Sequence, residues 1–172
     1  MFPVVKNENA DTLVLGVGNL LLADEGVGIQ VVERLQELYD LPETVQVLDG
    51  GTLGMDLLYY LEGTHRLLIV DAVETGCAPG TVIRLENDEV PAHLSAKMSP
   101  HQMGIPDMLF AAKLRDLYPE KIVLLGVQPE SLEPSLDLSP TVAALLDPLV
   151  KQIITELTNW GVPVEPLGER TI

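Results

Sequence analysis

The sequence has almost no cysteine and no long apolar stretch. Cys77 is the single cysteine, so a disulfide within the chain is excluded. The first residues lack a cationic segment followed by an apolar stretch, which is the pattern of a secretory signal. No apolar run approaches the roughly 20 residues that a membrane-spanning helix needs. We therefore expect a cytoplasmic protein that is not embedded in a membrane.

Basic residues are also scarce. The chain has 10 Lys and Arg against 26 Asp and Glu, which gives a formal net charge of −16. Such a charge repels the phosphates of nucleic acids and the anionic surfaces of membranes, so neither is an expected partner. Partners should be neutral or basic. The charge serves either solubility alone or the attraction of a basic substrate segment.

Apolar residues, in contrast, are abundant. They make up 47% of the 172 residues, which is enough for the buried core of one domain. We expect a single domain over residues 1–172, with its core over about residues 12–160. A loosely held tail is expected over residues 161–172, where Pro163 and Pro166 occur. A monomer is the default expectation.

Short runs of Val, Ile and Leu alternate along the chain with longer helical patterns. This alternation predicts an α/β fold with a doubly wound, mostly parallel sheet. The predicted strands cover residues 12–17, 45–48, 66–70, 81–85 and 121–127, with the fourth antiparallel and near an edge. The first predicted helix begins at Asp24 as N-cap, and two more cover residues 55–61 and 105–117. A last helix is predicted from Ser139 to Trp160 with a break at Pro148, and residues 86–100 are predicted to form a loop.

Polar residues directly after the strands are the first candidates for a site, because ligands bind outside the carboxyl ends of strands in open parallel sheets. Glu25 follows the first strand, Asp71 ends the third, and His101 enters a helix after the long loop. Two carboxylates and an imidazole suit a divalent transition metal and leave positions open for water or substrate. Spacing alone leaves helix-end charge or capping as alternative roles, and His93 is the reserve ligand.

Several short motifs follow the predicted strands in a fixed order. They are LGVGNLLLADEGVG at 15–28, DGGT at 49–52, IVDA at 69–72, SPHQMG at 99–104 and GVQPE at 126–130. In this order they resemble the motifs of the hydrogenase maturation endopeptidases, over about residues 12–160. The resemblance implies a twisted, mostly parallel five-stranded sheet flanked by helices on both faces, in three layers.

The resemblance also implies an activity. Members of that family remove a C-terminal extension from the large-subunit precursor of a nickel-iron hydrogenase after nickel has been inserted. The family's metal-contacting residues fall on Glu25, Asp71 and His101, and the metal is expected to be nickel carried by the substrate. Zinc or cadmium could replace it in a crystal. The family's segment for choosing the precursor falls on Asp49, Gly50, Gly51, Thr52 and Gly54.

A metal held by these residues would polarise the scissile carbonyl or lower the pKa of a bound water. Glu25 and Asp71 are therefore the predicted catalytic residues, with one of the two carboxylates as general base and His101 as a neutral ligand. The family is catalogued as aspartic-type, although no paired-aspartate dyad is apparent in the sequence. No further cofactor is expected.

Other functions fit parts of the sequence. The glycines at 16 and 18 begin a dinucleotide-binding fingerprint, but Leu21 stands where its third glycine would be. A receiver-like signalling domain also carries an aspartate after its third strand, although the acidic pair here comes too late and the expected lysine is replaced by GVQP at 126–129. A non-proteolytic chaperone that senses nickel shares every candidate residue and differs only in turnover.

Overall fold

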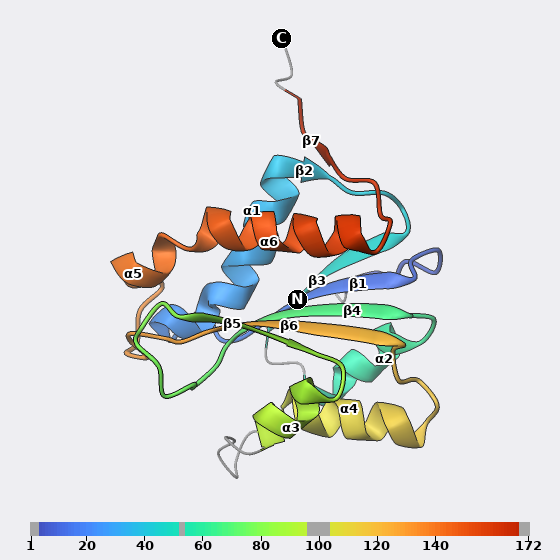
Figure 1. Cartoon of the computed structure of the whole chain (residues 1–172), viewed down its shortest axis with the longest axis horizontal. Helices are drawn as coiled ribbons and strands as arrows, with labels where there is room; N and C mark the ends of the chain where they lie inside the picture. Colours follow the sequence, from blue (N-terminus) through green and yellow to red (C-terminus); the bar gives the residue numbers. More distant parts are fainter. Residues whose placement is uncertain (1–3, 52–53, 96–103, 169–172) are drawn as a thin grey trace.

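A five-stranded sheet forms the centre of the molecule in the computed structural model, which describes residues 4–51, 54–95 and 104–168 (Figure 1). The strand order is β3-β1-β4-β6-β5. The strands are β1 (Thr12–Val17), β3 (Val45–Gly51), β4 (Arg66–Ala72), β5 (Val82–Glu86) and β6 (Lys121–Val127). The first four strands in this order run parallel, and β5 is an antiparallel edge strand beside β6. The predicted mostly parallel sheet is confirmed.

The three central strands are apolar because both of their faces are covered. Residues 13–15 of β1, 67–70 of β4 and 122–125 of β6 are all buried. Strands in such a position read as continuous apolar runs rather than as alternating patterns. Their short length and their Val, Ile and Leu content therefore sufficed to find them in the sequence.

Helices cover both faces of the sheet, as Figure 1 shows. On one face lie α1 (Val27–Leu38), α5 (Pro140–Ala143) and α6 (Leu146–Asn159), and on the other lie α2 (Leu58–Leu61), α3 (Glu89–Ser95) and α4 (Ile105–Leu114). Two short 3-10 helices, η1 (Ala23–Gly26) and η2 (Gly54–Leu57), precede α1 and α2. The three-layer prediction is confirmed. No helix in the described ranges is long and apolar enough to cross a bilayer.

Several helix predictions are wrong in detail. Asp24 is not the N-cap of α1, since η1 intervenes and Gly26 holds that position. The segment predicted as a loop contains α3, whose Pro91 lies in the first turn, where a proline removes no helical hydrogen bond. Pro148 also lies in the first turn of α6 and does not break it, because the break comes earlier, between α5 and α6.

The ends of the chain add smaller features. A two-stranded antiparallel pair joins β2 (Tyr39–Asp40) to β7 (Glu165–Pro166), and the Leu167 amide donates to the Leu38 carbonyl at 2.9 Å.

Helix α4 ends at Leu114, three residues earlier than predicted, because Asp116 adopts a left-handed conformation with φ 56°. The single domain and the loosely held tail stay predictions.

Candidate active site

The candidate site lies where β1, β4 and β6 end side by side. Gly18 makes it possible for the chain leaving β1 to turn back toward the sheet, because its φ is 143° and an added Cβ would lie 1.8 Å from the Glu25 carbonyl oxygen. The Asn19 amide donates to the same carbonyl at 3.2 Å. This turn places η1, and with it Glu25, against the end of β4.

Glu25 and Asp71 are brought together by this turn. Both residues are half-buried, and Asp71 pairs with Gly126 of β6 at the end of β4. The pKa of Asp71 is raised well above its usual value, first by burial and then by the negative charge of Glu25. Two neighbouring carboxylates of this kind are stabilised by a shared proton or by a bound cation. The structure thus unites two of the three predicted metal ligands.

The remaining predicted residues are only partly covered by the structure. His101 and Thr52 lie outside the described residues. His93 lies in α3, where its buried Nε2 has no hydrogen-bond partner within the described part of the chain. Among residues 4–51, 54–95 and 104–168, no three His, Cys, Asp or Glu side chains form a group that could hold a metal. The roles of His101 and Thr52 therefore stay predictions.

Asp24 has a role that the sequence analysis missed. Its fully buried carboxylate accepts hydrogen bonds from the amides of Glu130, Ser131 and Ser139 at 2.9, 2.9 and 2.7 Å, and from the Ser139 hydroxyl at 2.8 Å. Burial would raise the pKa of Asp24, but these hydrogen bonds outweigh it and hold the pKa below its usual value. Asp24 thereby fixes the loop after β6 beside Glu25.

Gln128 is a second residue that the motif contained without an assigned role. Its side chain is buried, and its Oε1 accepts hydrogen bonds from the amide and the hydroxyl of Thr75 at 2.6 and 2.8 Å. Its Nε2 donates to both carboxylate oxygens of Glu74 at 3.1 Å. These bonds connect the end of β6 to the segment that follows Asp71. The sequence could have indicated this role, because Gln128 directly follows an apolar strand and a buried amide requires hydrogen-bond partners.

The glycine-rich segment after residue 48 belongs partly to a strand. β3 continues to Gly51, whereas the sequence predicted its end at Leu48. The register to β1 shifts at this point, and the Gly18 amide donates to the Gly51 carbonyl at 3.2 Å. The Asp49 carboxylate accepts from the Gly51 amide at 2.9 Å. Asp49, Gly50 and Gly51 therefore lie on the same edge of the sheet as Glu25, and Gly54 opens η2 with φ 58°.

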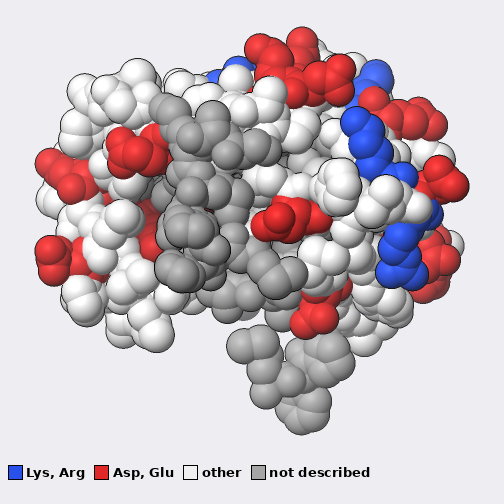
Figure 2. Space-filling view, turned by 90° about the horizontal axis from the view of Figure 1, so that it is seen from below, with Lys and Arg blue, Asp and Glu red and all other residues white. Residues whose placement is uncertain are grey.

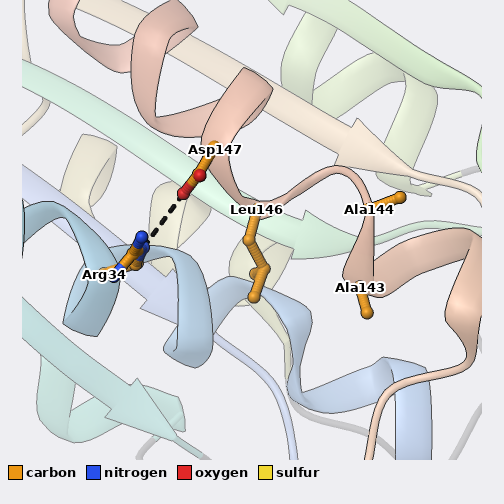
Figure 3. Close-up of a pocket in the computed structure, with 5 residues that line it drawn as sticks. All are labelled: Arg34, Ala143, Ala144, Leu146 and Asp147. Atoms are coloured by element: carbon orange, nitrogen blue, oxygen red, sulfur yellow. Dashed lines mark hydrogen bonds and ion pairs between the residues drawn. The ribbon is translucent and has the colours of Figure 1, made fainter.

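A separate depression of about 470 Å³ lies between α1 and the start of α6 and is shown in Figure 3. Its charged residues already pair with each other, since the Arg34 Nε donates to an Asp147 carboxylate oxygen at 2.9 Å. The other residues that line it are Ala143, Ala144 and Leu146. This lining offers neither a nucleophile nor an unpaired charge, so the sheet edge is the better candidate.

Known proteins resemble this chain closely. Residues 29–156 match the model of a family described as hydrogenase maturation protease. A hydrogenase 2 maturation protease from Escherichia coli K12 is 47% identical over 155 residues, covering 90% of this chain and 94% of that protein. The HupD hydrogenase expression/formation protein of Rhodobacter capsulatus is 43% identical over 164 residues, covering 94% and 77%. The solved structure of the hydrogenase maturating endopeptidase HybD from E. coli superposes with a TM-score of 0.86 at 46% identity, covering 90% and 96%.

Proposed function

Because this chain belongs to the hydrogenase maturation protease family, we propose that it is an endopeptidase that removes the C-terminal extension of a nickel-iron hydrogenase large-subunit precursor. The observation that carries the proposal is the juxtaposition of Glu25 and Asp71 at the carboxyl edge of the sheet. Such an edge is where open α/β sheets place their ligands. We further propose that the protein acts in the cytoplasm and as a monomer.

The metal of the proposed reaction is nickel already carried by the precursor. Two carboxylates at close range repel each other, and burial adds to the free energy of ionising Asp71. A divalent cation between them relieves both effects. We assign Glu25, Asp71 and His101 as the residues that contact this metal, with His101 taken from the sequence motif. Recognition of the metal would then restrict cleavage to precursors that have received it.

Hydrolysis at this site requires an activated water and a polarised carbonyl. A carboxylate of raised pKa is a better general base than an ordinary one, and this favours Asp71 in that role. Glu25 is the second candidate, because it lies beside Asp71 at the same edge of the sheet. The proposed mechanism is metal-dependent, with the catalogued aspartic type reflecting these acidic residues. Asp49, Gly50, Gly51, Thr52 and Gly54 are assigned to choosing the precursor.

The test mixes the purified full chain with nickel-loaded and nickel-free precursor and measures the mass of each product. Loss of a C-terminal peptide from the loaded precursor alone is the expected result. Glu25→Gln, Asp71→Asn and His101→Gln should each stop this loss. Glu130→Gln is the matched control, because it also removes one negative charge from the same edge of the sheet, at an exposed side chain of the loop after β6, and should still permit processing.

The alternative is a chaperone that senses nickel without cutting. It would bind the loaded precursor in preference to the free one, and the mass of that precursor would stay unchanged over many hours with the wild-type chain. Equal cleavage of loaded and nickel-free precursor would instead contradict the metal-sensing role while supporting the protease activity.

A further inference from the structure

Exposed leucines lie beside the candidate site. Leu21 precedes η1, and Leu132 and Leu136 lie in the loop after β6, with 64%, 50% and 69% of their surfaces exposed. These three side chains are called the leucine patch below. Exposed apolar side chains that gather near a site often mark a surface for a partner, whereas isolated ones require no explanation.

Backbone hydrogen bonds join the two segments of the patch. The Ser135 amide donates to the Leu21 carbonyl at 3.0 Å, and the Ala23 amide donates to the Ser135 carbonyl at 2.9 Å. Leu22 and Ser135 form the resulting parallel bridge. Leu21 and Leu136 each lie one residue from the bridged pair, so the two segments that carry them run side by side.

The patch is also fixed relative to the candidate site. The buried carboxylate of Asp24 holds the loop after β6 through its hydrogen bonds to Glu130, Ser131 and Ser139. Asp24 directly precedes Glu25 in η1. A peptide lying on the leucine patch would therefore be held at a constant distance from the two carboxylates.

The charge around the patch indicates what kind of peptide fits. The described segments at the carboxyl edge, residues 16–26, 49–51, 54–58, 71–81 and 126–139, contain nine Asp and Glu and no Lys or Arg. In Figure 2 the visible Lys and Arg side chains gather along the right and upper rim, while the left side shows acidic and uncharged side chains. The four parallel strands end at the left in Figure 1, and both views share the horizontal axis.

We propose that the leucine patch docks a segment of the hydrogenase large-subunit precursor that carries apolar side chains together with Lys or Arg. This inference rests on the proposed function and adds the chemistry of the substrate segment. The leucines supply apolar contact area, and the surrounding carboxylates attract the cationic side chains. A second copy of this chain fits poorly, because it would bring two edges of the same negative charge together.

The experiment measures kcat and KM separately for cleavage of the nickel-loaded precursor by the full chain. The double variant Leu21→Ser/Leu136→Ser should raise KM about tenfold or more and leave kcat within about twofold, since it removes apolar contact without touching the carboxylates. Leu114→Ser is the matched control. Leu114 is 73% exposed on α4, distant in sequence from the patch, and its replacement should leave KM unchanged.

Other outcomes separate this inference from the proposed function. If the wild-type chain cleaves no precursor, the proposed function fails. If it cleaves and the double variant matches Leu114→Ser, the docking surface is wrong while the protease stands. Replacing Lys and Arg near the cleavage site of the precursor with Gln should also raise KM. An unchanged KM would show that the carboxylates around the patch do not attract these cationic side chains. If the wild-type chain is a dimer in solution and the double variant is a monomer, the patch binds a second copy of the chain and the docking proposal is wrong.

Discussion

Charged side chains are arranged in opposite ways at the two ends of the central strands. At the amino ends, the Arg66 guanidinium donates from one nitrogen to both carboxylate oxygens of Asp11 at 3.0 Å, and from another to the Trp160 carbonyl at 2.7 Å. At the carboxyl ends, Glu25 and Asp71 are two acids beside each other. The same sheet thus holds a matched ion pair at one edge and a like-charge pair at the other.

The pKa shifts follow this difference. Burial would raise the pKa of Asp11, but its hydrogen bonds to Thr12 and Arg66 and the charge of Arg66 outweigh it, and the pKa falls below its usual value. The pKa of Asp71 moves the other way, because burial and Glu25 act in the same direction. The amino edge therefore stabilises the fold, whereas the carboxyl edge keeps an electrostatic strain that a cation would relieve. Such displaced pKa values are typical of functional sites.

The largest effect should come from giving the carboxyl edge the charge pattern of the amino edge. Glu25→Lys places a positive charge beside Asp71 and should lower processing of the loaded precursor by about a thousandfold or more, because it removes a proposed metal ligand and puts a positive charge where the metal would bind. The midpoint of thermal unfolding should be higher than that of Glu25→Gln, which removes the repulsion but adds no ion pair. Mass spectrometry of the product and calorimetry give the two readouts. Processing at the wild-type rate would contradict the assignment of Glu25.

The next effect concerns the anchor of the carboxyl edge. Asp24→Ala leaves three amides and one hydroxyl without their acceptor, and we expect a loss of about 3 kcal/mol in the free energy of unfolding. Hydrogen exchange should increase at Glu130, Ser131 and Ser139. Denaturant unfolding measures the first quantity. Unchanged exchange at these amides would show that the loop is held by other contacts.

Much of the fold could be predicted from the sequence, because its central strands are short apolar runs. The limits of β1 and β6 agree with the prediction to the residue. Local chemistry also sufficed at α5, where the Ser139 hydroxyl accepts from the Val142 amide. The prediction failed where a proline was interpreted without its position in the helix, as in α3 and α6.

The candidate site was predicted less completely. The position after a strand predicted that Glu25 and Asp71 lie at one edge, since topology alone brings strand ends together, and the structure places them beside each other. Asp24 was misassigned because its neighbours in sequence suggested a helix cap, while its hydrogen-bond partners lie more than 100 residues away. No local pattern encodes such a contact. The buried amide of Gln128 was missed for the same reason.

A smaller effect is expected at the amino edge. Asp11→Ala removes the carboxylate that pairs with Arg66, and the free energy of unfolding should fall by about 1 kcal/mol near neutral pH, because both side chains are partly exposed. The folded pKa of Asp11 is lowered, so this stabilisation is present above the unfolded value of 3.8 and is lost as the pH falls through the folded pKa. Unfolding in urea at neutral and acidic pH measures the difference. The processing rate should not change, and a large loss of activity would contradict the division between the two edges.

A gain in stability is expected at the carboxyl edge, and its sign distinguishes this edge from the amino edge. The folded pKa of Asp71 is raised above the unfolded value of 3.8, so the wild-type chain loses stability as the pH rises through the interval between them. Asp71→Asn carries no such charge. Its stability relative to wild type should therefore increase across this interval and stay constant above the folded pKa. Thermal unfolding of both chains at a series of pH values measures the difference, and zinc should raise the wild-type midpoint more than that of the variant. A relative stability of Asp71→Asn that falls with rising pH would show that a hidden cation already compensates Asp71.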